Sequence, residues 1–237
     1  MKVLFINGSP DEKNTTYAAI EEVASTLKTK NIDSEIVWLG KASIADCIDC
    51  GTCSKTHKCI YSDLVNITIE KMKDFDGLVI ASPVYYSGPT GRIQSFLDRF
   101  FYACPKEYLC GKVGASLTVC RRGGNTATFE RLNQYFLMNN MFVIGSQYWN
   151  MAHGFTYEDA KKDKEGMQTM RRLAFNMAYV LECIEAGKEK GITYPTLEKK
   201  REVTNFMDGK EGHLKTSQPT TRTVVSREVL SIRRRLL

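Results

Sequence analysis

The sequence predicts a doubly wound α/β fold with a mostly parallel sheet. Short apolar runs that stop abruptly at turn residues alternate with segments in which apolar residues recur at helical spacing. Alternation of this kind produces right-handed β–α–β units, whose strands lie parallel in one sheet. The length of 237 residues is enough for one such domain with its own core.

The first half of the chain contains two expected strands and two expected helices. The run KVLFI at residues 2–6 stops at Asn7-Gly8-Ser9-Pro10, as a buried parallel strand does before a turn. Residues 15–28 carry apolar side chains at helical spacing and predict a helix, which a second strand follows at residues 34–39. A helix over residues 63–73 then begins at an aspartate, a common amino-terminal cap.

The second half repeats the alternation. Residues 77–83 form another apolar run that ends in a loop, and Ile93, Phe96, Leu97 and Phe100 share one face of a helix over residues 89–101. The remaining elements are a strand at 113–119, a helix at 126–138, a short fifth strand at 141–144 and a long last helix at 164–188.

The net charge of +6 is concentrated near the C-terminus. Residues 215–237 contain six basic residues and one acidic residue, so they carry +5 of the total. We expect one domain over residues 1–208 and a basic, flexible tail over residues 209–237. Because the rest of the chain is nearly neutral, no nucleic-acid partner is expected.

The apolar segments are too short to cross a membrane. No run of about 18 apolar residues occurs, and the first apolar run is shorter than the core of a signal peptide. We therefore expect a cytoplasmic protein without a membrane partner. Eight cysteines in such a chain favour metal or redox use over a disulfide framework.

Three loops are expected to meet at one edge of the sheet: residues 8–16, 82–88 and 120–126. Doubly wound sheets bind ligands at the carboxyl ends of their strands, near the point where the strand order reverses. The first loop leads into a helix and offers hydroxyls, an amide and unpaired backbone N–H groups, which suit a phosphate monoester. The candidate phosphate ligands are Ser9, Asn14, Thr15 and Thr16. The same residue types also serve as ordinary helix caps.

The second and third loops suit a flat ring. A loop bounded by proline and glycine that carries two tyrosines offers both an aromatic surface and backbone groups, as a flavin ring requires. Its candidate residues are Pro83, Val84, Tyr85, Tyr86 and Ser87. The third loop adds Arg121 and Gly123. Arginines there suit a reduced anionic ring, the phosphate of NADPH or an acidic substrate, or they simply face solvent.

These motifs resemble one family. Ile6-Asn7-Gly8-Ser9-Pro10 with Asn14-Thr15 is similar to the phosphate loop of NADPH-dependent FMN reductases and related iron–sulfur flavoproteins, although Asp11 stands where the family usually has a basic residue. Ser82-Pro83-Val84-Tyr85 and the later Phe96-Leu97-Asp98-Arg99 resemble its flavin-contacting segment and the helix that follows. Asp98 and Arg99 are expected to form a structural ion pair or a subunit contact. The resemblance spans roughly residues 1–190.

The resemblance implies more than the pattern of elements does. It implies a flavodoxin-like, five-stranded parallel sheet in the order 2-1-3-4-5, with helices on both faces and FMN as the cofactor. NAD(P)H is the implied co-substrate, and a homodimer or homotetramer is the implied assembly.

Four of the cysteines are clustered in one predicted loop, residues 47–59. The spacing Cys47-x2-Cys50-x2-Cys53-x5-Cys59 places four thiolates within thirteen residues, enough for one [4Fe–4S] cluster. It is similar to the compact spacing of iron–sulfur flavoproteins, which implies that these cysteines are cluster ligands. Zinc is an alternative, although four-cysteine zinc sites usually use two separated pairs, and a motif without metal is another.

Three functions follow from these features. The first is an FMN-dependent oxidoreductase that exchanges electrons between a donor, NAD(P)H or ferredoxin, its flavin and a [4Fe–4S] cluster. The second is a cluster-free NAD(P)H-dependent reductase of quinones, azo or nitro compounds, or flavin. The third is a non-enzymatic, flavodoxin-like electron carrier. The partner is accordingly a small-molecule acceptor or a redox protein such as ferredoxin. No acid or base is identified, since hydride transfer at the flavin does not require one.

Overall fold

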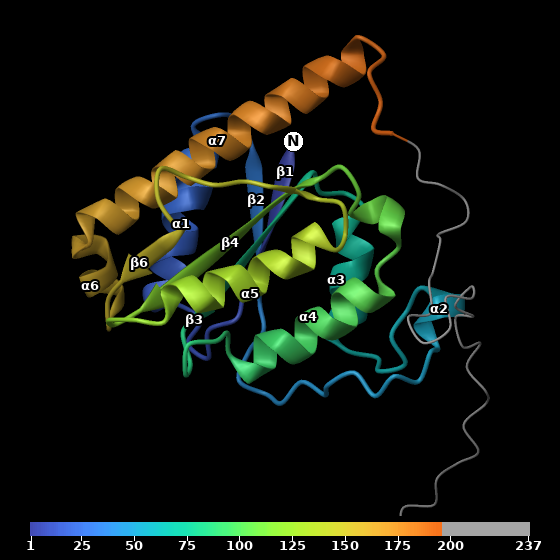
Figure 1. Cartoon of the computed structure of the whole chain (residues 1–237), viewed down its shortest axis with the longest axis horizontal. Helices are drawn as coiled ribbons and strands as arrows, with labels where there is room; N and C mark the ends of the chain where they lie inside the picture. The colour runs from blue at the N-terminus through green and yellow to red at the C-terminus, as the bar shows by residue number, and fades with distance from the viewer. Residues whose placement is uncertain (196–237) are drawn as a thin grey trace, which may run out of the picture. The chain divides into compact units, whose positions relative to one another are not determined.

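A parallel sheet forms the centre of the molecule (Figure 1). The computed structural model describes residues 1–195, and its compact unit comprises residues 1–47 and 52–195. The strands of the sheet, in chain order, are β1 (Lys2–Asn7), β2 (Asp33–Trp38), β3 (Gly77–Pro83), β4 (Val113–Cys120), β5 (Phe142–Val143) and β6 (Met151–His153). Their order across the sheet is β2-β1-β3-β4-β5, with β6 also paired to β4, and all pairs are parallel. The predicted flavodoxin-like order is therefore confirmed.

Helices cover both faces of the sheet (Figure 1). One apolar cluster joins the sheet to α1 (Thr15–Lys28) and α7 (Lys164–Glu189), and a second joins it to α3 (Leu64–Met72), α4 (Gly91–Ala103) and α5 (Asn125–Leu137). Alternate residues of β1 enter different clusters, Val3 and Phe5 the first and Leu4 and Ile6 the second. Residues 3–6 of this strand are all apolar because both of its faces are buried.

The fifth position of the sheet is shared by two short strands. Phe142 and Val143 pair with the beginning of β4, and Met151–His153 pair with its end. The prediction of a single strand at residues 141–144 thus finds β5 and misses β6, so the sheet has six strands rather than five. Three residues that follow a polar loop give too short an alternation to indicate a strand.

The predicted helices occur within three residues of their expected ends. Asp63 caps α3 as expected, since its side chain accepts a hydrogen bond from the backbone N–H of Val65. Three short helices were not predicted: α2 (Cys53–Thr56), the 3₁₀ helix η1 (Lys106–Tyr108) and α6 (Tyr157–Lys162). The signal for α6 was present, because Thr156 and Asp159 form a capping box.

Two other expectations concern the ends of the domain and its surroundings. The boundary at residue 208 and the tail over residues 209–237 lie outside the described residues. Within residues 1–195, no helix is both long and apolar enough to cross a membrane.

An ion-pair network ties α1 to α6 and α7. The carboxylate of Glu22 on α1 accepts hydrogen bonds from Lys161 on α6, at 3.1 Å, and from Arg171 on α7. Burial alone raises the pKa of Glu22, but the hydrogen bonds from Arg171 and Lys161 outweigh it, so its pKa lies below the ordinary value of 4.5. A carboxylate of this kind stabilises the fold above its unfolded pKa and loses that contribution as the pH falls through its native pKa.

Replacing Glu22 with glutamine tests this network. We expect the free energy of unfolding of Glu22→Gln to fall by about 1.5–3 kcal/mol at neutral pH, because hydrogen bonds to a charged group are lost. The difference from the wild type should shrink once the pH is taken well below the ordinary carboxyl pKa of 4.5, toward the lower native pKa of Glu22. Urea unfolding at both pH values measures this. The control is Glu185→Gln, which removes a half-exposed pair with Lys188 and should change stability by less than about 0.5 kcal/mol. An equal deficit of Glu22→Gln at both pH values would contradict the assignment.

Candidate functional site

The first loop is folded by a buried asparagine at the end of β1. Asn7 is fully buried; its Nδ2 donates to the carbonyl of Glu12 at 3.0 Å, and its Oδ1 accepts from the backbone N–H of Ser9 at 3.1 Å. The hydroxyl of Ser9, which is 5% exposed, accepts from the backbone N–H of Asp11. The Asp11 carboxylate lies 3.2 Å from Lys41, which balances the acidic residue in this loop. The conformation of this loop, at the end of β1, is thus fixed by its own side chains.

The amino terminus of α1 offers polar groups that could bind a ligand. Asn14 is in the N-cap position, but within the described residues its side chain makes no capping hydrogen bond. Thr16, in the first turn, is fully buried, and its hydroxyl has no partner among residues 1–195. A buried hydroxyl beside free helix N–H groups is a favourable place for an anion, since each unpaired group costs free energy until it is bonded. Ser9, Asn14, Thr15 and Thr16 therefore fit a phosphate group.

The second loop presents its two tyrosines to solvent. Tyr85 and Gly88 exchange backbone hydrogen bonds of 2.8 and 2.9 Å, which close a tight turn. Tyr86 and Ser87 at its tip have φ values of 49° and 58°, a left-handed pair of the kind found in two-residue hairpins. As a result Tyr86 is fully exposed and Tyr85 is 51% exposed. Exposed aromatic rings at a sheet edge suit a flat ligand or a partner surface.

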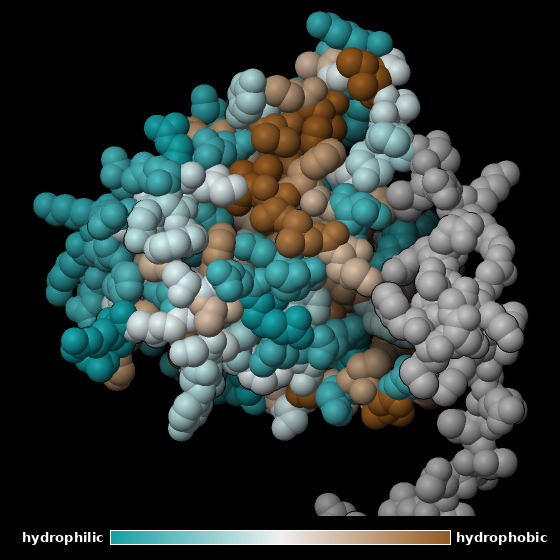
Figure 2. All heavy atoms as spheres, in the orientation of Figure 1, coloured by the Kyte–Doolittle hydropathy of each residue, from teal (hydrophilic) through white to brown (hydrophobic). Residues whose placement is uncertain are grey.

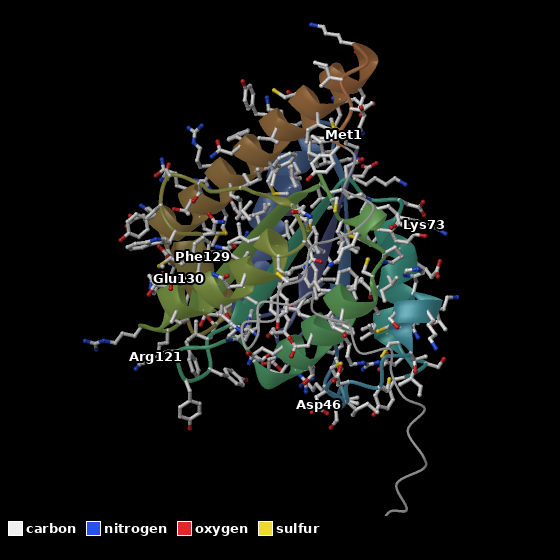
Figure 3. The ribbon with its side chains drawn as sticks, turned by 45° about the vertical axis from the view of Figure 1, so that its right-hand side comes forward. Met1, Asp46, Lys73, Arg121, Phe129 and Glu130 are labelled. Carbon is white, nitrogen blue, oxygen red and sulfur yellow. The ribbon has the colours of Figure 1, made fainter. Side chains whose placement is uncertain are left out.

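The third loop packs directly against the second. Gly124 has a φ of 92°, and a Cβ there would lie 2.8 Å from Cγ1 of Val84 and 3.0 Å from the backbone of Ser87. Only glycine fits this contact. Arg121 and Gly123 are exposed beside it. Figure 3 places Arg121 at the end of the molecule opposite Met1.

The first and second loops are also joined. The backbone N–H of Gly8 donates to the carbonyl of Ala81 at 2.9 Å, and the hydroxyl of Thr90 donates to the carbonyl of Gly8 at 3.1 Å. The backbone N–H of Thr90 in turn donates to the hydroxyl of Ser82. All three predicted loops therefore form one contiguous edge.

The cysteine loop is anchored at one end by a buried arginine. Arg99 on α4 is 1% exposed, and its guanidinium donates to both carboxylate oxygens of Asp63 at 2.8 Å. Its Nε also donates to Sγ of Cys59 at 3.1 Å, and the ring of Tyr61 lies 4.7 Å below the guanidinium. The side chain of Asn66 bonds both backbone groups of Cys59. Cys59 is thereby held through both its thiol and its backbone.

The other cysteines of the motif lie in different surroundings. Cys47 is exposed, and Cys53 begins α2 and packs against the second apolar cluster. Cys50 belongs to residues 48–51, which lie outside the compact unit. No group of three or more His, Cys, Asp or Glu side chains within residues 1–195 is placed to hold a metal ion. The donor chemistry suits an iron–sulfur cluster, but the described geometry does not assemble a metal site.

Asp98 and Arg99 do not form an ion pair with each other, and the alternative of a subunit contact stays a prediction. Asp98 instead accepts a hydrogen bond from the hydroxyl of Tyr135 and lies near Arg131. Adjacent residues of a helix point in directions about 100° apart, so they cannot face one another. Asp63, the partner of Arg99, is 36 residues away in the sequence, and no local pattern signals that contact.

One polar residue at this edge was not predicted from the sequence. His153 ends β6 and is the register partner of Cys120, the last residue of β4. Recognition of the short strand β6 would have placed this histidine beside the third loop.

An apolar groove lies at the opposite, amino-terminal end of the strands. Its volume is about 620 Å³, and its lining includes Met1, Lys112, Phe142, Ile184 and Tyr194. Figure 2 shows apolar side chains gathered along the carboxyl-terminal half of α7. Pro195, the last described residue, is part of its lining. The groove shares no residue with the three loops.

The fold and the three joined loops define a flavodoxin-like α/β protein with a candidate ligand site at the carboxyl ends of its strands. The sequence matches the family model for NADPH-dependent FMN reductase over residues 1–156. It is 35% identical over 202 residues to an iron–sulfur flavoprotein of Archaeoglobus fulgidus, covering 80% of this chain and all of that protein. It is 30% identical over 192 residues to an iron–sulfur flavoprotein of Methanocaldococcus jannaschii, covering 78% and 100%.

Solved structures agree on the fold. RosB, determined with 8-demethyl-8-formylriboflavin-5'-phosphate, matches with a TM-score of 0.62 at 15% identity, over 92% of this chain and 98% of RosB. An archaeal flavodoxin matches with a TM-score of 0.51 at 14% identity, over 77% of this chain and 99% of the flavodoxin. This chain belongs to the NADPH-dependent FMN reductase family, on the branch of the iron–sulfur flavoproteins, and is an FMN-dependent oxidoreductase.

The unpaired hydroxyl of Thr16 gives a test of the phosphate site. We expect Thr16→Val to raise the FMN dissociation constant about tenfold or more, because a hydrogen bond to a charged group is lost. The stability of the apoprotein should stay the same or rise, since a buried hydroxyl without a partner is removed. Fluorescence titration and urea unfolding measure the two effects. The control Thr26→Val alters the same helix away from its amino terminus, where the hydroxyl bonds Glu22, and should leave FMN affinity unchanged. Unchanged affinity in Thr16→Val would exclude this hydroxyl as a ligand.

The role of Arg99 is tested by stability. Arg99→Gln removes both bonds to Asp63 and the bond to Cys59, so the free energy of unfolding should fall by about 2–5 kcal/mol. Arg131→Gln, which changes a half-exposed arginine, should cost less than about 1 kcal/mol. Urea unfolding of the apoproteins compares them, and equal losses would argue against a special role for the buried pair.

Proposed function

We propose that this oxidoreductase binds FMN across the three joined loops, takes electrons from NAD(P)H or ferredoxin, and reduces a small-molecule acceptor or a redox protein. The observation that carries the proposal is the buried hydroxyl of Thr16, which has no partner among the described residues, at a helix terminus without a side-chain cap. Bound FMN would supply a ring that accepts and returns electrons singly or as a hydride.

Each loop has its own part in holding the cofactor. Ser9, Asn14, Thr15 and Thr16 would bind the phosphate through hydroxyls and backbone N–H groups. The segment 83–87 would present backbone groups and the two tyrosines to the ring. Arg121 and Gly123 would form the third wall, where the exposed guanidinium is suited to an anionic group such as the phosphate of NADPH.

We also propose that Cys47, Cys50, Cys53 and Cys59 hold a [4Fe–4S] cluster. The support is the compact spacing of four thiols and the family branch to which the chain belongs. The fixed position of Cys59 gives such a cluster one ready ligand. The rest of the motif would have to close around the cluster, because the described geometry brings no three ligands together.

A cluster-free NAD(P)H-dependent reductase of quinones, azo or nitro compounds, or flavin is the second candidate. The observation that favours it is the same lack of an assembled ligand group within residues 1–195. Metal analysis of one purified sample distinguishes zinc in the cysteine motif, whereas a non-enzymatic electron carrier is distinguished by the absence of turnover with NAD(P)H and a small-molecule acceptor.

Anaerobic purification separates these candidates. We expect the protein to contain FMN at one per chain, about four iron atoms and about four acid-labile sulfides, because four cysteines suit one cubane cluster. Absorption spectra with metal and sulfide analysis measure all three. A protein with flavin but no iron would contradict the cluster proposal and leave the flavin proposal standing. Bleaching of the flavin by NADPH, or only by reduced ferredoxin, identifies the donor.

We further propose a homodimer or homotetramer. The fully exposed ring of Tyr86, at the tip of the second loop, is the feature that supports a partner surface beside the site. Sedimentation of the purified protein measures the assembly, and a monomer would contradict it.

A further inference from the structure

His153 lies at the same sheet edge as the three loops. In the parallel pair of β4 and β6, Cys120 and His153 are register partners, so their side chains leave the sheet on the same side. The backbone N–H of Gly154 donates to the carbonyl of Cys120 at 3.1 Å, which continues the pairing by one residue. The third loop begins directly after Cys120, and its Gly124 touches Ser87 of the second loop.

A carboxylate holds the imidazole of His153. Oδ2 of Asp163 accepts the backbone N–H of His153 at 2.7 Å and lies 3.5 Å from Nδ1 of the ring. The other oxygen of Asp163 accepts from the backbone N–H of Gly166 at 2.9 Å, and its side chain is only 19% exposed. A fixed carboxylate beside Nδ1 orients the ring and favours a proton on that nitrogen. The reactive nitrogen is then Nε2.

Asn125 matches both states of that nitrogen. It is 3% exposed, and its Nδ2 lies 3.4 Å from Nε2 of His153, while its Oδ1 has no partner among the described residues. The amide nitrogen is suited to donate to a bare Nε2. After rotation of the amide, its oxygen is suited to accept from a protonated Nε2. The long contact leaves Nε2 free to bond a closer ligand.

Cys120 does not compete for the proton as a thiolate. Burial raises the pKa of its thiol, against the opposing effects of the Arg122 backbone N–H and the Asn125 side chain. The pair of Cys120 and His153 is therefore a neutral thiol beside an imidazole rather than an activated nucleophile.

We propose that His153 supplies a proton to two-electron acceptors of the quinone class. The inference rests on the proposed FMN-dependent reduction at this edge. A quinone becomes a hydroquinone by taking up one hydride, which brings two electrons and one proton, and one further proton. That proton leaves Nε2 of His153 as the N–H bond breaks and an O–H bond forms on the quinone oxygen. The imidazole regains a proton from solvent, to which 44% of its side chain is exposed.

The experiment compares two acceptors on protein that is already reduced. Wild type and His153→Gln, each loaded with FMN, are reduced with dithionite and mixed in a stopped-flow instrument with benzoquinone or with ferricyanide. Ferricyanide takes up single electrons and no proton. We expect His153→Gln to lose about a hundredfold or more in the rate with benzoquinone, the usual contribution of a positioned acid, and to keep the rate with ferricyanide.

Two further variants test whether the effect comes from the imidazole of His153. Asp163→Asn should slow benzoquinone reduction in the same direction by releasing the imidazole, and Glu158→Gln, an exposed change in the neighbouring helix, should leave both rates unchanged. Equal rates of wild type and His153→Gln with benzoquinone, or parallel losses with both acceptors, would overturn the proton role. Failure of the wild type to bind FMN, or to reduce either acceptor, would instead overturn the proposed function and the inference with it.

Discussion

The parallel alignment of β1, β3 and β4 is the constraint on which the site depends. In register, Asn7 of β1 lies beside Ala81 of β3, and the end of β3 lies beside Val119 of β4. The loops that follow these strands therefore start at one edge, whatever their own sequences are. Their contacts, from Gly8 to Ala81 and from Gly124 to Val84 and Ser87, depend on strands buried on both faces.

The two chemically distinctive parts of the molecule are organised differently. The three loops hold their shape through backbone hydrogen bonds and glycine contacts. Among residues 1–195 they leave the hydroxyl of Thr16 without a partner and the N-cap of α1 without a side-chain hydrogen bond. The cysteine loop is anchored by two side chains: Arg99 bonds Asp63, Cys59 and the carbonyl of Ala45 at once, and Asn66 bonds the backbone of Cys59. Cys59 is thus held at one end of the motif, while Cys47 at the other end is exposed.

Local sequence patterns predicted the parts of the structure that local forces determine. The buried strand at residues 2–6, the helix at 15–28 and the cap at Asp63 all follow from apolar spacing and helix-end chemistry. The pairing of Arg99 with Asp63 and of His153 with Cys120 depends on the assembled sheet and helices, so no spacing along the chain signals it. The strand β6 was missed because three residues show too little alternation. The prediction of FMN came from the resemblance to a family, because composition and periodicity alone do not identify a cofactor.

We expect FMN to bind at the carboxyl ends of the strands rather than in the apolar groove at their amino-terminal ends. Hydrogen–deuterium exchange of the apoprotein with and without FMN tests it most directly. We expect slower exchange in peptides that contain residues 8–16, 82–90 and 120–126, and little change around the groove. Protection confined to the groove peptides near Met1, Lys112 and Tyr194 would contradict it.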